Sequence, residues 1–242
     1  MWTKSDLAWL SKNYPELKQK QPNTIEGRLT FQMLRANGLY VVNPSAKQIQ
    51  DLSPPDYLYL CDTYKIRIAW PKDARFPTAH ETGGKLAATA KRLNKNLLDM
   101  HQYQEDGSLC LAATMQLERT FRKKFKLDAF VEEFMIPYLF AQTHYAKTEE
   151  WLWGELEHGS WGLLQWLGRE KQYDDADTFA TYAYVKSQIG EDATHKLLKI
   201  RPRGHYACLC GSGKKTRDCH PDVQQGIIRL RGAVSRHIIK LN

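Results

Sequence analysis

The sequence lacks the apolar runs that a membrane protein needs. Its most apolar stretch, residues 130–141, contains two glutamates, whereas a membrane-spanning helix needs about 20 mostly apolar residues. The first residues also lack the basic segment and the apolar block of a secretory signal. These absences exclude an integral membrane protein, and they predict a protein of the cytoplasm with no membrane partner.

A disulfide framework and a nucleotide-binding loop are also not predicted. The chain has five cysteines, an odd number with no export signal, so metal-binding or catalytic roles gain weight for the thiols. No G-x-x-x-x-G-K sequence is present, so we do not expect the chain to adenylate its own substrate. The length of 242 residues and a composition with 42% hydrophobic and 26% charged residues predict one globular domain of fair size, either alone or with a small attachment.

The net charge of +8 is concentrated near one end of the chain. From residue 201 onward there are nine basic residues against two acidic ones, while the rest holds 26 basic and 25 acidic residues. A basic tail of this kind suggests contact with a polyanion. RNA is the weaker alternative, because the tail offers few rings on which bases stack, namely Tyr206 and its histidines.

Hydrophobic periodicity predicts an α+β fold. An amphipathic helix is expected over residues 6–14 with Ser5 as its N-cap, and Cys61 is expected as a small buried hydrophobe within a strand. The predicted strands form an antiparallel four-stranded meander over residues 24–34, 39–42, 57–61 and 64–70. The predicted helices cover residues 86–93, 115–166 with a kink or restart at Pro137, 178–199 and 227–241, with a linker at 168–177.

Four potential metal ligands fall within thirteen residues near the end of the chain. They are Cys208, Cys210, Cys219 and His220. Three thiolates and one imidazole form a closed tetrahedral set of the kind that structural zinc takes. The segment 201–222 resembles the SEC-C motif, including its Cys-x-Cys-Gly-Ser-Gly-Lys-Lys core and its terminal Cys-His pair. That resemblance implies a small zinc module that docks a protein or, in some members, a polyanion.

Cys110 follows a turn signal at Asp106-Gly107 and has His101 nine residues upstream. A thiol on such a partly open segment is the kind that reacts, although composition alone favours a buried core cysteine. His101, Gly107 and the block Leu109-Cys110-Leu111 together resemble the active-site segment of ubiquitin-conjugating enzymes. The order of an opening helix, a meander and the Phe76-Pro77 element extends the resemblance over about residues 1–165.

The resemblance is closest to the divergent bacterial members found in anti-phage CBASS operons. It implies a transferase that carries a protein C-terminus as a thioester on Cys110 and passes it to an amine. The partners implied are a protein modifier or the C-terminus of a cGAS-like nucleotidyltransferase, with a separate activating enzyme or a pre-activated donor. In this chain Gln102 and Tyr103 replace the family's Pro and Asn, so Gln102 is the candidate for supporting the oxyanion. His101 either activates the thiol or braces its loop.

Four segments are predicted on this basis. Residues 1–167 form the ubiquitin-conjugating-like domain, 168–200 a linker and helix, 201–222 the zinc motif, and 223–242 a basic C-terminal helix. His158, beside two glycines, either faces the active-site cleft or caps a helix end. Tryptophans 151, 153, 161 and 166 are expected to fill the core or a docking face. The alternative function is a catalytically inactive zinc-containing adaptor that docks a protein or nucleic-acid partner, with Cys110 merely packed.

Overall fold

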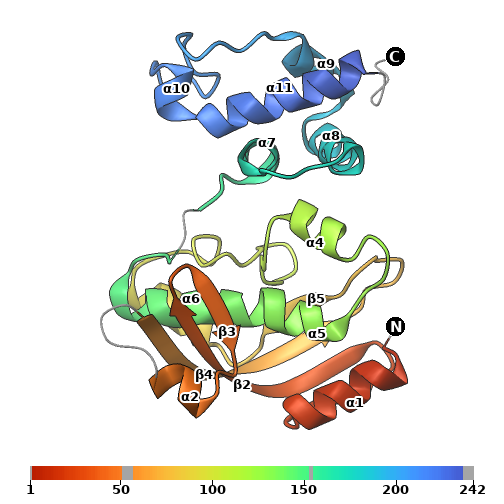
Figure 1. Ribbon diagram of the computed structural model, residues 1–242, viewed down its shortest axis with the longest axis vertical. Helices are drawn as coiled ribbons and strands as arrows, with labels where there is room; N and C mark the ends of the chain where they lie inside the picture. Colours follow the sequence, from red (N-terminus) through yellow and green to blue (C-terminus); the bar gives the residue numbers. More distant parts are fainter. Residues whose placement is uncertain (1, 51–56, 153–154, 237–242) are drawn as a thin grey trace. The chain divides into compact units, whose positions relative to one another are not determined.

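The computed structural model of the protein describes residues 2–50, 57–152 and 155–236 (Figure 1). The chain divides into two compact units. The first comprises Met1–Ala112 and Phe121–Gly154, and the second comprises Ala113–Thr120 and Glu155–Asn242. The first unit contains an antiparallel sheet with helices, and the described part of the second is helical with irregular connections. The predicted α+β class is confirmed, whereas the second unit takes residues 113–120 and 155–167 from the predicted first domain.

The sheet of the first unit is antiparallel throughout. Its strands are β1 (Leu17–Gln21), β2 (Thr24–Ala36), β3 (Leu39–Val42), β4 (Tyr57–Ala69) and β5 (Thr78–Glu81). Hydrogen bonds connect them in the order β1-β2-β4-β5, and β3 pairs only with β2. The antiparallel sheet is as predicted, but its strands are not: the predicted strands 57–61 and 64–70 are both part of β4, and the predicted strand 39–42 is β3, which pairs only with β2.

Two strand predictions were wrong. We expected a turn at Asp62-Thr63, but β4 runs through both residues, which pair with Phe31 and Thr30 of β2. Asp62 is tolerated inside the strand because its carboxylate bonds Lys85 and accepts from Thr143 Oγ1 at 2.8 Å. Strands β1 and β5 were not predicted, because each is only four or five residues long and lacks a clear alternation of apolar and polar residues.

Cys61 is exposed, not buried as predicted. Its β2 neighbour is Gln32, so it lies on the polar face of the pair.

The first unit contains six described helical segments. They are α1 (Lys4–Asn13), α2 (Ala46–Gln50), α3 (Lys85–Arg92), α5 (Leu127–Ala129), the π-helical turn η1 (Phe130–Met135) and α6 (Ile136–Thr148). Thr3, not Ser5, caps α1: its hydroxyl accepts from the Asp6 N–H, and the Asp6 carboxylate accepts from the Thr3 N–H. The restart predicted at Pro137 is confirmed, since η1 ends and α6 begins beside it.

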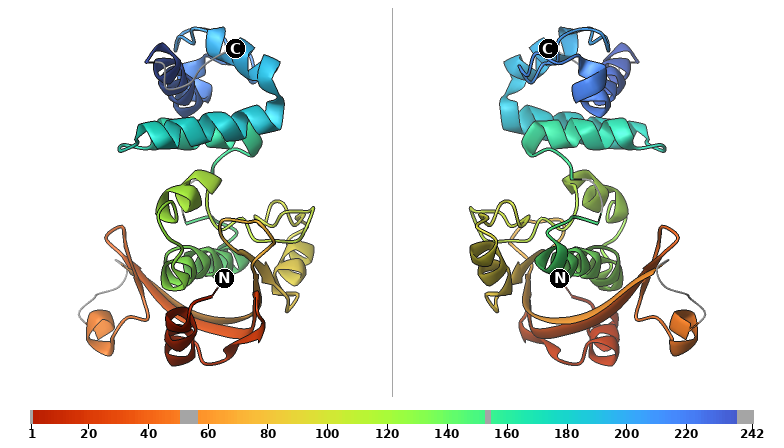
Figure 2. Two further views of the ribbon diagram at one scale, coloured as in Figure 1. Left: turned by 90° about the vertical axis from the view of Figure 1, so that its right-hand side faces the viewer. Right: turned by 90° about the vertical axis from the view of Figure 1, so that its left-hand side faces the viewer.

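Helix α6 packs on the sheet and closes the core of the first unit. Figure 2 shows this helix, in green, along the concave side of the curved strands. Alternate residues of β2 bury their side chains on one face: Ile25, Leu29, Phe31 and Met33 are at most 1% exposed. Helix α6 presents the nearly inaccessible Leu139 and Phe140 to the core. This two-layer packing fixes α6 beneath the segment that carries Cys110.

The second unit is built from helices around its own hydrophobic core. They are α4 (Thr114–Thr120), α7 (Gly159–Arg169), α8 (Asp175–Ile189), α9 (Glu191–Lys199), α10 (Thr216–Cys219) and α11 (Pro221–Ser235). The predicted linker at 168–177 was wrong, because it contains the end of α7 and the capped start of α8. Buried Asp177 explains the error: it pairs with Arg119 of α4 at 2.8 Å, so this charged segment is anchored.

Two further boundaries differ from the prediction. The helix expected over 178–199 is interrupted at Gly190, which separates α8 from α9. The final helix starts at Pro221, earlier than the predicted residue 227, and residues 237–242 lie outside the described part of the chain. None of the described helices combines the length and hydropathy that crossing a bilayer requires.

Candidate functional sites

Cys110 lies at the end of a tight loop between α3 and α4. The loop is closed by a bridge between Gln102 and Leu109, and the Cys110 N–H donates to the His101 carbonyl at 2.8 Å. Gly107 has a φ of 71°, a left-handed conformation that glycine adopts without strain. The Leu109 N–H donates to Ala79 O at 2.8 Å and so ties the loop to β5. These backbone bonds hold the half-buried thiol in one place.

Helix α6 supports this loop from below. The Tyr138 hydroxyl donates to the carbonyl of Met100 at 2.9 Å and to that of His101 at 3.3 Å. The Gln142 amide nitrogen also donates to Met100 O, at 2.6 Å. Sequence reasoning missed both side chains, because they lie about forty residues from the loop and no local pattern connects them to it. Tyr138 thereby bonds the same carbonyl that accepts the Cys110 N–H, and Gln142 holds the residue before it.

The Cys110 thiol has one polar partner that was not predicted. The Tyr103 hydroxyl donates to Cys110 Sγ at 3.3 Å. Burial raises the pKa of the Cys110 thiol, and the hydrogen bond from Tyr103 opposes that rise without cancelling it. The resting side chain is therefore a neutral thiol near pH 7, and its nucleophilicity depends on conversion to the thiolate.

His101 contributes to the loop through its backbone and its ring. It adopts a φ of 52°, its carbonyl accepts the Cys110 N–H, and its ring packs edge-on against Trp151 at 4.8 Å between centroids. Of the two roles considered for His101, this geometry favours bracing the loop. Trp151 in turn stacks on Tyr145 of α6 at 4.2 Å.

The Gln102 amide closes the loop. Its nitrogen donates to Gly107 O at 2.8 Å, and the buried His80 of β5 hydrogen-bonds the backbone of the same glycine. Burial lowers the pKa of His80, so its imidazole is neutral at pH 7. The hydroxyl of Tyr103, rather than the amide of Gln102, is the side-chain donor that contacts the thiol.

The four predicted metal ligands come together in the second unit. One atom from each of Cys208, Cys210, Cys219 and His220 lies within 4.8 Å of the others. Cys208 Sγ is 3.3 Å from His220 Nδ1, and Cys219 Sγ is 3.5 Å from Cys210 Sγ and 3.2 Å from His220 Nδ1. In a tetrahedral site with metal–sulfur distances of about 2.3 Å, neighbouring sulfurs lie roughly 3.8 Å apart. The donor set therefore fits a metal ion.

The cluster favours thiolate at one position. Hydrogen bonds from the side chain and backbone of Ser212 lower the pKa of the Cys210 thiol to about 6. Burial raises the pKa of Cys208. Cys210 is therefore the thiol that ionises first. Its thiolate offers a metal ion one anionic ligand before Cys208 loses its proton.

Glu157 is a residue of this site that sequence reasoning missed. Its Oε1 lies 3.3 Å from Nε2 of His220, whose Nδ1 faces the thiols. Trp161 packs against the same imidazole at 5.1 Å between centroids. A carboxylate on the outer nitrogen of a ligating histidine fixes its tautomer and ring orientation. In the sequence, the position of Glu157 next to His158 was the only feature that drew attention to it, and nothing linked it to His220.

The remaining predicted residues are His158 and the tryptophans. His158 occupies the N-cap position of α7 in the second unit, but its side chain makes no capping hydrogen bond there, and Cys110, His101 and Gln102 belong to the first unit. Trp166 is buried and carries the Arg119 guanidinium over its ring at 4.9 Å. The predicted Trp153 lies outside the described residues.

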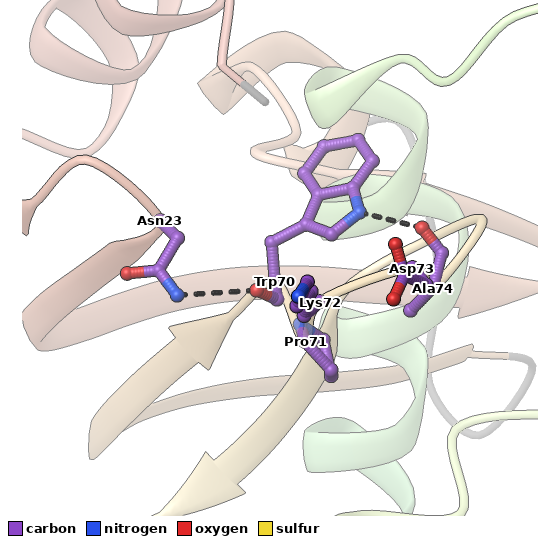
Figure 3. A pocket seen from close by; sticks show the side chains of 6 residues that line it. All are labelled: Asn23, Trp70, Pro71, Lys72, Asp73 and Ala74. Carbon is purple, nitrogen blue, oxygen red and sulfur yellow. Dashed lines mark hydrogen bonds between the residues drawn. The ribbon is translucent and has the colours of Figure 1, made fainter.

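A pocket of about 280 Å³ lies at the end of β4, lined by Asn23 and residues 70–74 (Figure 3). Trp70 Nε1 donates to Ala74 O at 2.9 Å, and Asn23 Nδ2 donates to Trp70 O at 3.2 Å. The first bond lies within the turn after β4 and the second ties Asn23 to the start of that turn, and none of the predicted catalytic residues lines the pocket.

Comparisons with protein-family models, with curated proteins and with solved structures gave no match.

Proposed function

We propose that the first unit is a ubiquitin-conjugating-like acyl transferase that carries a protein C-terminus as a thioester on Cys110. The observation that carries the proposal is the hydrogen bond from the Tyr103 hydroxyl to a half-buried thiol on a loop braced by α6. The antiparallel path β1-β2-β4-β5 after an opening helix agrees with the ubiquitin-conjugating fold. On the resemblance of residues 101–112, the donor is an activated protein C-terminus, and the pathway is anti-phage defence involving a cGAS-like nucleotidyltransferase.

A second candidate is an adaptor without catalysis. The observation that favours it is the raised pKa of Cys110, because a neutral buried thiol is a poor nucleophile. In that case the metal-ligand cluster and the basic residues of the second unit supply the function by docking a partner. The two candidates differ in whether Cys110 forms a covalent acyl intermediate.

Acyl transfer to Cys110 is testable with a pre-activated donor. We expect the protein to accept the acyl group of a synthetic peptide thioester ending in Gly-Gly, with release of the donor's thiol, giving a mass increase that added thiol or hydroxylamine removes by attacking the acyl carbon, whereas a phosphine reductant leaves it in place. Cys110→Ser should abolish this labile adduct, because the sulfur that forms the thioester is gone. Cys61→Ser is the matched control, since Cys61 is also a free cysteine but lies exposed on β4. An adduct on Cys61 with none on Cys110 would favour the adaptor.

We further propose that the ion held by the second unit is Zn²⁺ in a structural role. A set of three thiolates and one imidazole leaves no ligand position open at a four-coordinate ion. Cys and His ligands also suit Zn²⁺ better than the oxygen-preferring Mg²⁺ and Ca²⁺. When bound, the ion would join the loop that carries Cys208 and Cys210 to the start of α11.

Glu157→Ala should weaken Zn²⁺ binding about 10- to 100-fold, because His220 loses the carboxylate that orients it. Glu157→Gln should weaken it less, since the amide oxygen still accepts a hydrogen bond. The measurement is Zn²⁺ competition with a chromogenic chelator. Glu191→Ala serves as the control, because that carboxylate pairs with Lys186 and His195 and contacts none of the ligands. Equal affinities for all three variants would show that Glu157 does not orient His220.

A further inference from the structure

We propose that Tyr103 is a catalytic residue: its hydroxyl donates to Cys110 Sγ when the sulfur carries negative charge, both before acylation and when the thiolate leaves. The inference rests on the proposed acyl transfer and adds to it a donor at the reacting atom. The observation behind it is the hydrogen bond between the Tyr103 hydroxyl and Cys110 Sγ, which lie 3.3 Å apart.

The backbone of Tyr103 is fixed on both sides. Its N–H donates to Ser108 O at 2.9 Å, and its carbonyl accepts from the Gly107 N–H at 3.0 Å. The Cys110 N–H is bound to His101 O. The Tyr103 hydroxyl and Cys110 Sγ are therefore carried by the two facing strands of one short loop, and main-chain hydrogen bonds fix the distance between these strands. A donor placed in advance of the reaction needs little reorganisation when charge appears on the sulfur.

The phenol keeps its proton. Burial raises the pKa of Tyr103, and the neighbouring Cys110, Asp106 and Glu105 raise it further. The hydroxyl is therefore neutral across the physiological range and acts as a donor to sulfur rather than as a base. Tyr103 as a residue is 40% exposed and Cys110 is half-buried, so this side of the loop is open to solvent in part.

The transfer step balances with the groups named. The amine nitrogen attacks the acyl carbon, the new N–C bond forms, and the C–Sγ bond breaks with its electron pair returning to sulfur. The nitrogen gives up a proton to water, and the Cys110 thiolate takes one from water, leaving an amide and a free thiol. During this step the Tyr103 hydroxyl hydrogen-bonds the departing sulfur but keeps its own proton. Charge-assisted bonds of this type are about twice as strong as neutral ones.

Tyr103→Phe tests the inference, because it removes the hydroxyl and leaves the ring. We expect alkylation of Cys110 by iodoacetamide at pH 7 to slow about 3- to 10-fold, with the pH profile of the reaction displaced to higher pH. Discharge of a Gly-Gly peptide thioester from Cys110 to free lysine should slow about 10- to 100-fold. Peptide mapping distinguishes Cys110 from the other cysteines, and Cys61 is the internal reference. Tyr59→Phe is the control variant, since it removes a hydroxyl bonded to Gln32 on the exposed side of β4.

The outcomes separate this inference from the function on which it rests. If the unmodified protein takes no acyl group from the peptide thioester, the proposed transferase function is wrong. If it is acylated, and Tyr103→Phe matches the unmodified protein in both the alkylation profile and the discharge rate, the transferase stands and the role of Tyr103 is overturned. A displaced alkylation profile together with slowed discharge supports the proposal. A loss of amide protection in residues 97–111 would instead assign the change to a disturbed loop and overturn it.

Discussion

Replacing Cys219 with serine should abolish tight Zn²⁺ binding and destabilise the second unit. Cys219 Sγ lies within 3.5 Å of both Cys210 Sγ and His220 Nδ1. Replacing it removes the ligand atom that lies next to two of the other three ligands. Protein that binds zinc only when folded gains about 4 kcal/mol at a zinc concentration one thousand times Kd. The variant should lose that contribution, and chelation of the unmodified protein should have the same effect.

The ligand segment has few other sources of stability. Its large apolar side chains Tyr206 and Leu209 are 51% and 43% exposed, so they contribute little burial. Main-chain bonds such as Cys208 N–H to Lys214 O close the loop, but such bonds contribute only about 1 kcal/mol each. Small segments without a sufficient core commonly depend on a metal. The ion is therefore expected to be the main constraint on residues 201–220.

Hydrogen exchange of the full-length protein measures this effect in each unit separately. With zinc removed, amide protection should fall in residues 201–236 and remain unchanged in β2 and β4. Cys61→Ser is the control for changing a cysteine to serine, since Cys61 lies on the exposed face of β4. Unchanged protection of the ligand segment after complete chelation would contradict a structural role for the ion.

Local patterns were sufficient to predict part of the fold. The strands over residues 24–34 and 39–42 and the restart beside Pro137 depend on neighbouring residues, and both were predicted. The prediction failed where a distant partner decides the structure. Asp62 looks like a turn residue until Lys85 and Thr143 satisfy its carboxylate, and Asp177 looks like part of a linker until Arg119 pairs with it.

The same distinction holds for the candidate sites. The four metal ligands were predictable because they lie within thirteen residues and turn back on one another. Glu157 was missed because it is 63 residues from His220. Tyr103 is close to Cys110 in sequence, yet only the folded loop shows that its hydroxyl, and not the amide of Gln102, reaches the sulfur. Sequence spacing alone does not determine which of two adjacent side chains points at a thiol.

The close crossing of α7 and α11 predicts that a larger side chain at Gly226 will strongly destabilise the second unit. A Cβ atom added at Gly226 would lie 2.1 Å from Leu164 O, and one added at Gly168 would lie 1.8 Å from Asp222 O. The two helices therefore touch through their backbones at glycine, and backbone atoms cannot move aside as a flexible side chain can. Gly226→Val should force the helices apart and destabilise the second unit by about 3 kcal/mol or more. Its thermal transition and its hydrogen-exchange protection should both fall.

Gly232→Ala in the same helix separates this clash from a general effect of changing glycine. Its added Cβ would lie 3.3 Å from the end of the Arg236 side chain, which can move. Alanine also favours the helix by up to about 1 kcal/mol over glycine, so this variant should be as stable as the unmodified protein or more so. Because both substitutions are in α11, a loss confined to Gly226→Val would locate the cause at the backbone contact with Leu164. Equal stability of the two variants would mean that the helices do not pack as closely as this crossing requires.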